Sequence, residues 1–304
     1  MKAERPYSFG YSEFTTWPWT FREDLRKYAA HGADVIEVCE FKLPHEDYGE
    51  HLDLIPREGL QAASVQMQVH SVFEDSMASK PQEPADRIAA MKRSIALSAP
   101  HVPRDTPFIV ITGIPPDGNI RQAVQTTVDA LKDLGEYAAQ NGVRIAFEPL
   151  SPVNLHTDTA VWGLDQGLEI LERVAHPAVG LCLDTWNVWQ TATLEDVIAQ
   201  CAGRILFVQM SDWKTPRSTA DRYSLGDGEI PLASMMRAIR KTGYTGSWIV
   251  EILSSFHLNG SLWKSDLDEV LRRNASAFEA LWHQSDPVFT EKEQMPHGSS
   301  AAAS

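Results

Sequence analysis

The chain has 304 residues, with 41 acidic and 27 basic side chains, which gives a formal net charge of −14 at pH 7. Nucleic acids and anionic membranes attract basic surfaces, so this acidity argues against both as partners and leaves a small molecule as the expected ligand. The N-terminus lacks the apolar core of a signal peptide, and no apolar stretch is long enough to span a membrane. We therefore expect a cytoplasmic protein.

Short apolar runs rich in β-branched residues alternate along the chain with longer segments of helical period. Several runs are apolar throughout, as expected for strands that are buried on both faces of a parallel sheet. Eight strands are predicted, at 7–14, 35–39, 62–69, 108–114, 143–147, 180–183, 205–209 and 247–252. Helices are predicted at 19–31, 87–98, 120–140, 165–174, 194–202, 232–241 and 266–283, and the segment 44–59 has the weakest pattern.

This alternation of strands and helices predicts an α/β protein with a (β/α)₈ TIM barrel that occupies residues 1–285 as a single domain. The alternative is an open doubly wound sheet, which normally has a glycine-rich phosphate-binding turn after its first strand. The sequence SEFTT stands at that place instead, at 12–16. Residues 286–304 have no periodic pattern, and we expect them to form a disordered tail. The three cysteines form no CxxC pair and lie in or beside apolar runs, which indicates packing rather than disulfides.

Four successive predicted strands, the fifth to the eighth, end in oxygen-bearing side chains: Glu148, Asp184, Gln209 and Glu251. The carboxyl ends of barrel strands carry the active site, so these side chains are expected on one rim. Three crowded carboxylates repel each other unless a cation neutralises them, and an all-oxygen set suits Mg²⁺ or Mn²⁺ better than Zn²⁺. The alternative is that one or two of the four, Gln209 above all, cap helices or support the others.

Five short motifs resemble the sugar phosphate isomerase/epimerase family of xylose isomerase-like TIM barrels. They are FEPL at 147–150, LDTW at 183–186, QMSDWK at 209–214, GDGEIP at 226–231 and IVEI at 249–252. The family includes ketose 3-epimerases, inosose isomerases and dehydratases, 3-dehydroshikimate dehydratases and the catalytic subunits of C-deglycosidases. The resemblance spans residues 9–282. It implies the fold and a metal more strongly than it implies a substrate.

The resemblance implies that Glu148, Asp184, Gln209 and Glu251 bind Mn²⁺ or Mg²⁺, and that Glu148 and Glu251 are the catalytic acid–base pair. Two positions depart from the family pattern. Gln209 stands where the isomerases usually have histidine, as in the dehydratase branch, and Asn187 stands where a histidine is common. With these imidazoles absent, the two glutamates are the best candidates for the base.

Candidates for substrate binding come from several of the same loops. Glu37 on the second strand matches a common family position, and His70 ends the third strand. Trp186, Asn187, Lys214, Arg217 and Arg222 follow the sixth and seventh strands, where the cations could bind a carboxylate, a phosphate or a hydroxyl, or simply be solvated. His156 and His257 are weaker candidates. Tryptophans 17, 19, 186, 189 and 213 lie near the same loops, where aromatic rings stack on sugars or planar groups, although lid packing explains most of them.

The family chemistry implied here is proton abstraction next to a carbonyl through a metal-stabilised enediolate. Reprotonation gives a sugar or cyclic-polyol isomerase or epimerase. Loss of a leaving group gives a lyase that acts on inosose, dehydroshikimate or a 3-keto-glycoside, and Gln209 and the tryptophans favour this alternative. A binding protein that has lost its bases is a third possibility. Homo-oligomers or a small partner subunit are also compatible with the resemblance.

Overall fold

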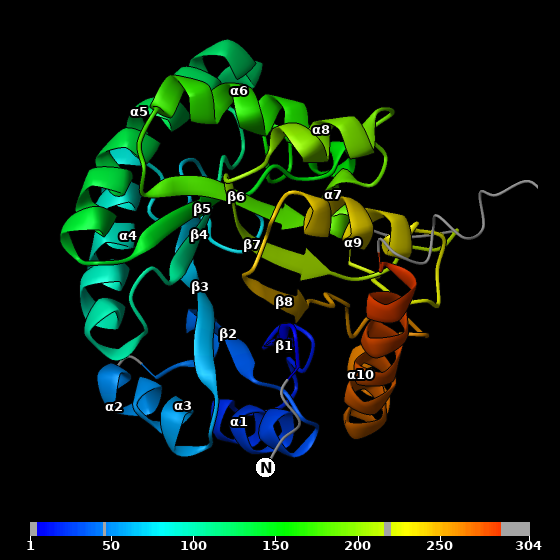
Figure 1. Cartoon of the computed structure of the whole chain (residues 1–304). Coiled ribbons are helices and arrows are strands. Elements are labelled where there is room, and N and C mark those ends of the chain that lie inside the picture. The colour runs from blue at the N-terminus through cyan, green and yellow to red at the C-terminus, as the bar shows by residue number, and fades with distance from the viewer. Residues whose placement is uncertain (1–4, 45–46, 216–219, 287–304) are drawn as a thin grey trace, which may run out of the picture.

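The computed structural model describes residues 5–44, 47–215 and 220–286, and in them eight parallel strands close into a barrel in chain order (Figure 1). Each strand pairs with the next, and β8 pairs with β1. The strands are β1 (Ser8–Ser12), β2 (Val35–Cys39), β3 (Gln61–Ser71), β4 (Pro107–Ile111), β5 (Arg144–Phe147), β6 (Val179–Asp184), β7 (Ile205–Met210) and β8 (Ser247–Val250). The closed topology confirms the predicted barrel and excludes the open sheet.

The helices lie outside the strands and cover the barrel (Figure 1). They are α1 (Phe21–Ala30), α2 (Tyr48–Leu52), α3 (Leu54–Arg57), α4 (Pro84–Ser98), α5 (Ile120–Gln140), α6 (Leu164–Val174), α7 (Thr185–Val188), α8 (Leu194–Gln200), α9 (Leu232–Lys241) and α10 (Leu267–Gln284). Segment 44–59, which had the weakest pattern, contains the two short helices α2 and α3. In the described residues no helix is long and apolar enough to cross a membrane.

The core has two parts. A large cluster lies between strands and helices, and includes Leu131 and Leu134 of the amphipathic helix α5. A small separate cluster combines one residue from each of six strands, as expected for side chains that fill a barrel interior. Its members are Val35, Ile109, Ala146, Cys182, Phe207 and Ile249. All three cysteines are buried and unpaired, which agrees with packing as their role. Residues 287–304, most of the predicted tail, lie outside the described residues.

Candidate functional site

A layer of polar side chains, here called the polar rim, lies next to the small interior cluster at the carboxyl end of the barrel. Successive side chains of a strand point to opposite faces, so the residue two positions after an interior residue points inward again, one layer closer to the carboxyl end. In five strands this next position holds a polar side chain. The pairs are Val35 and Glu37, Ala146 and Glu148, Cys182 and Asp184, Phe207 and Gln209, and Ile249 and Glu251. A layer of four carboxylates and one amide thus follows a layer of five apolar side chains.

Glu148 and Asp184 are joined through one side-chain amide. Asn187 Nδ2 donates to Glu148 Oε1 at 2.7 Å and to Asp184 Oδ2 at 2.9 Å. Asp184 also caps α7, because its Oδ1 accepts from the backbone of Trp186 at 3.0 Å. The capping and site roles, which the sequence left as alternatives for the strand-end acids, therefore coincide in Asp184.

Arg222 lies between two of the rim carboxylates. Its Nη1 donates to Asp184 Oδ2 at 2.9 Å and to Glu251 Oε2 at 2.8 Å. The guanidinium carbon stands 4.8 Å from the centre of the Trp186 ring, and the buried Nε has no hydrogen-bond partner in the described residues. Of the two predicted loop cations that lie in the described residues, Lys214 and Arg222, the structure brings Arg222 into the site.

Gln209 presents its amide nitrogen, not its oxygen, to the carboxylates. Nε2 donates to both oxygens of Glu37, at 3.0 and 3.1 Å, and to Glu251 Oε1 at 3.0 Å. Its oxygen accepts from the Cys182 thiol at 3.0 Å. This differs from the expected role as an oxygen ligand, because an N–H is the partner that two bare carboxylates prefer. Rotation of the amide by half a turn exchanges the two atoms.

Burial dominates the electrostatics of the rim. It raises the pKa of Glu148 and of Glu251 well above 4.5, and neighbouring carboxylates add to both shifts. Burial also raises the pKa of Asp184, where Arg222 opposes it, and raises the pKa of Glu37 to about 7. These carboxyl groups therefore hold their protons more strongly than ordinary exposed acids do.

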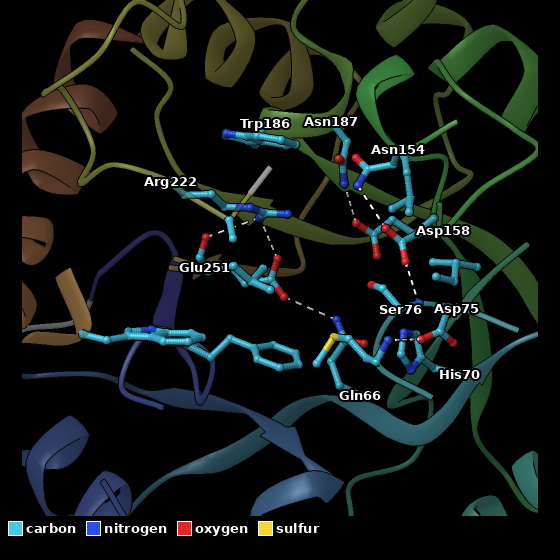
Figure 2. Close-up of a pocket in the computed structure, with 18 residues that line it drawn as sticks. Gln66, His70, Asp75, Ser76, Asn154, Asp158, Trp186, Asn187, Arg222 and Glu251 are labelled. Atoms are coloured by element: carbon cyan, nitrogen blue, oxygen red, sulfur yellow. Dashed lines mark hydrogen bonds and ion pairs between the residues drawn. The ribbon is translucent and has the colours of Figure 1, made fainter. Parts of the chain in front are cut away.

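A cavity of about 330 Å³ opens above this rim, and Figure 2 shows the residues around it. Its polar wall includes Glu148, Glu251, Asn187 and Arg222. Further polar side chains from strand β3 and from other loops also line the cavity, and apolar side chains complete its wall. The other lining residues are Phe14, Gln66, His70, Asp75, Ser76, Met77, Ile111, Leu150, Asn154, Asp158, Trp186, Ala220, Leu253 and Trp263.

The structure separates the expected substrate-binding residues. His70, Trp186, Asn187 and Arg222 line the cavity. Glu37 was expected to bind substrate, but it is fully buried and is not among the residues that line the cavity, and Gln209 and Ser64 donate hydrogen bonds to its carboxylate. Lys214 is exposed and is not among the residues that line the cavity. Arg217 lies outside the described residues.

The weaker histidine candidates are away from the cavity. His156 and His257 are both exposed, and neither lines it. Sequence reasoning missed Gln66, Phe14 and Trp263. Gln66 donates to Glu251 Oε1 at 3.3 Å. It sits in the apolar run VQMQV, where a glutamine two positions after Ser64 on the same face of the strand was the available signal.

The donor atoms and the charge of this rim are of the kind that a divalent cation binds. Glu37, Glu148, Asp184 and Glu251 are all buried, and the Arg222 guanidinium pairs with Asp184 and Glu251, so full ionisation leaves −4 + 1 = −3. These donors are hard oxygens, which Mg²⁺ and Mn²⁺ prefer. In the arrangement seen across the described ranges, no three His, Cys, Asp or Glu side chains are grouped closely enough to hold an ion. Arg222 occupies the place between Asp184 and Glu251 instead.

Comparisons with known proteins point to the same family. The chain is 32% identical over 140 residues to 3-dehydroshikimate dehydratase of Pseudomonas putida, which covers 43% of this chain and 21% of the relative. It is 27% identical over 170 residues to L-ribulose 3-epimerase of a Methylomonas species, covering 55% and 52%. The chain therefore spans about a fifth and about half of the length of these two relatives.

Solved structures agree on the fold. The crystal structure of the IOLI protein with a bound zinc atom superposes with a TM-score of 0.76 at 18% identity, covering 92% of this chain and 99% of that one. The family model described as "Xylose isomerase-like TIM barrel" matches residues 25–274. The match covers most of the barrel, including the four strands that carry Glu148, Asp184, Gln209 and Glu251. The chain belongs to the xylose isomerase-like TIM barrel family.

Proposed function

We propose that this protein is a divalent-metal-dependent isomerase or epimerase of a sugar or cyclic polyol that transfers a proton at the carbon next to a carbonyl. One observation carries the proposal: Glu148 and Glu251, from β5 and β8, border the same cavity, and burial raises the pKa of both. A carboxylate whose pKa is raised is a stronger proton acceptor than an ordinary exposed carboxylate. The named activities of the two curated relatives, an epimerase and a dehydratase, support this reaction class.

The side chains around the two glutamates hold each carboxylate in place. Asn187 binds Glu148, whereas Gln66 and Gln209 both donate to Glu251 Oε1. These bonds fix the carboxylate orientation while leaving other lone pairs for the substrate proton. In the proposed reaction one glutamate removes the proton. Its return to the other face gives an epimer, and its transfer to the neighbouring carbon gives an isomer.

Glu148, Asp184, Gln209 and Glu251 would hold Mn²⁺ or Mg²⁺, which supplies the positive charge that polarises a carbonyl when it is bound. Gln209 would present its oxygen by rotating its amide. Arg222 would give up its bridge between Asp184 and Glu251, and its guanidinium would then be available to a substrate oxygen. This exchange keeps the buried carboxylates paired with a cation in both states.

A lyase that acts on a cyclic keto-substrate is the second candidate. Gln209 replaces the histidine usual in the isomerases, and Phe14, Trp186 and Trp263 give the cavity an aromatic lining that a free ketose does not require. The first step is the same proton abstraction. Expulsion of a leaving group on the next carbon then replaces reprotonation.

Deuterium exchange distinguishes these candidates. The Mn²⁺-loaded protein is incubated in D₂O with ketoses, inososes, dehydroshikimate and 3-keto-glycosides, and the products are followed by NMR and mass spectrometry. Deuterium next to the carbonyl without loss of a group supports the isomerase or epimerase, whereas net elimination supports the lyase. An exchange rate in Glu251→Gln equal to wild type would contradict the proposal, with Glu58→Gln, at an exposed glutamate, as the matched control. Tight Mn²⁺ binding without exchange of any ketone would favour a binding protein.

A further inference from the structure

Five aromatic side chains gather beside the cavity, on loops that follow three neighbouring strands. Phe14 and Trp17 follow β1, Phe41 lies in the turn η1 (Glu40–Lys42) after β2, and Phe256 and Trp263 follow β8. Strand β1 pairs with both β2 and β8, so these loops are adjacent on the rim. We call this group the aromatic shelf.

The rings of the shelf form a continuous series. The Trp17 ring is stacked with the Phe14 ring, with 5.6 Å between ring centroids and 15° between ring planes. It is also stacked with the Trp263 ring, with a centroid distance of 6.1 Å and an interplanar angle of 24°. The ring centroids of Phe256 and Trp263 are 5.5 Å apart, and those of Phe41 and Phe14 are 6.4 Å apart. Trp17 is nearly parallel to each of its two neighbours, and stacking of this kind is favourable between planar rings.

The shelf is continuous with the proposed active site. Phe14 and Trp263 line the same cavity as Glu251. At its other end Phe256 is 47% exposed, one of the few large hydrophobic side chains at the surface of the described chain. The shelf therefore leads from the cavity wall to solvent, which places it beyond the ring of a substrate that reacts at Glu148 and Glu251.

The chemistry of the shelf selects among planar partners. The indole N–H of Trp263 already donates to the backbone oxygen of Phe14 at 2.8 Å. Trp263 contacts the rings of Trp17 and Phe256. The three phenylalanines of the shelf have no polar side-chain atom that could bind a hydroxyl group. A second sugar ring would stack through its apolar C–H face, but its hydroxyls would find few polar partners among these side chains, which is less favourable. An aryl group has no hydroxyls to satisfy.

We propose that the aromatic shelf is a subsite for an aryl substituent, and that the substrate is therefore an aryl-substituted keto-sugar or keto-polyol. The placement of its reacting ring rests on the proposed function. The aryl group would stack against Trp263 and Phe256 while the carbonyl-bearing ring faces Glu148 and Glu251. An aromatic contact of this kind contributes up to about tenfold in affinity.

Binding is measured by calorimetry, without turnover, using phenyl and methyl glycosides of glucose, galactose and xylose as matched pairs. We expect wild type to bind at least one phenyl glycoside about tenfold more tightly than its methyl partner. Trp263→Ala should remove most of this preference, and Phe256→Ala, at a half-exposed position, should reduce it about threefold. Phe256→Ala should leave methyl glycoside binding unchanged, because Phe256 does not line the cavity.

Trp189→Phe is the matched control. Trp189 packs against Trp213 at 5.0 Å, and neither residue lines the cavity, so the phenyl preference should persist. Equal affinities for phenyl and methyl glycosides, absence of binding by either, or a preference that survives both shelf variants would overturn the subsite. Deuterium exchange with an unsubstituted ketose tests the proposed function separately. Deuterium exchange without a preference for phenyl glycosides would contradict only the aryl subsite. A preference for phenyl glycosides without deuterium exchange would contradict only the proposed reaction.

Discussion

Burial of Glu37 should make the stability of this barrel depend on pH between about 5 and 8. Burial raises the pKa of Glu37 from 4.5 to about 7, even though hydrogen bonds from Gln209 and Ser64 favour the ionised form. Between these values the folded state holds a proton that the unfolded state has released. The contribution is fully present below pH 4.5 and is lost as pH rises through 7. Integrated from pH 5 to pH 8, this one group lowers the free energy of unfolding by about 2–3 kcal/mol.

Glu37→Gln tests this reasoning, because an amide of the same size does not ionise. Urea unfolding is followed by circular dichroism at pH 5 and pH 8, with EDTA present to exclude metal effects. Wild type should lose about 2–3 kcal/mol more than the variant between the two pH values. The exposed variant Glu58→Gln should behave as wild type. An equal pH dependence in wild type and Glu37→Gln would refute the argument from burial.

Three further outcomes follow from the site. Arg222→Met should lower the free energy of unfolding in EDTA by about 3–5 kcal/mol, because it leaves the buried Asp184 and Glu251 without a cationic partner. Mn²⁺ should then raise the melting temperature of the variant more than that of wild type. An unchanged melting temperature of the variant in EDTA would argue against the Arg222 bridge. Glu251→Gln should reduce turnover by about 10²–10⁴-fold with an unchanged far-ultraviolet spectrum, and wild-type turnover removes Glu251 from the mechanism. EDTA should abolish deuterium exchange and Mn²⁺ or Mg²⁺ should restore it, and exchange that persists in EDTA speaks against metal dependence.

Much of the barrel could be predicted from periodicity. The predicted helices at 120–140 and 232–241 match α5 and α9 in full, because each has an apolar stripe bounded by residues that end a helix. The first strand was predicted too long, at 7–14, whereas β1 ends at Ser12. The backbone turns there, and Thr15 N donates to Ser12 O at 2.9 Å. A run of apolar residues does not distinguish a strand from the buried turn that follows it.

The loop residues were harder to predict. Lys214 and Arg222 had equal standing in the sequence, as cations after the seventh strand. The structure buries Arg222 between two carboxylates and leaves Lys214 in solvent. That difference depends on the path of the loop and on pairing with Asp184 and Glu251, and no local pattern encodes either.

The sequence by itself determined the layering of the site. An interior apolar residue followed two positions later by an acid, as in Ala146 and Glu148, is a local pattern that the twofold period of a strand turns into a polar rim. Only the tertiary structure decided which groups neutralise that rim and what lies beside it. Gln209 meets Glu37, 172 positions away in the chain, and Trp263 meets Phe14, 249 positions away. Such contacts arise when the barrel closes, because closure brings β8 against β1 and places their loops side by side.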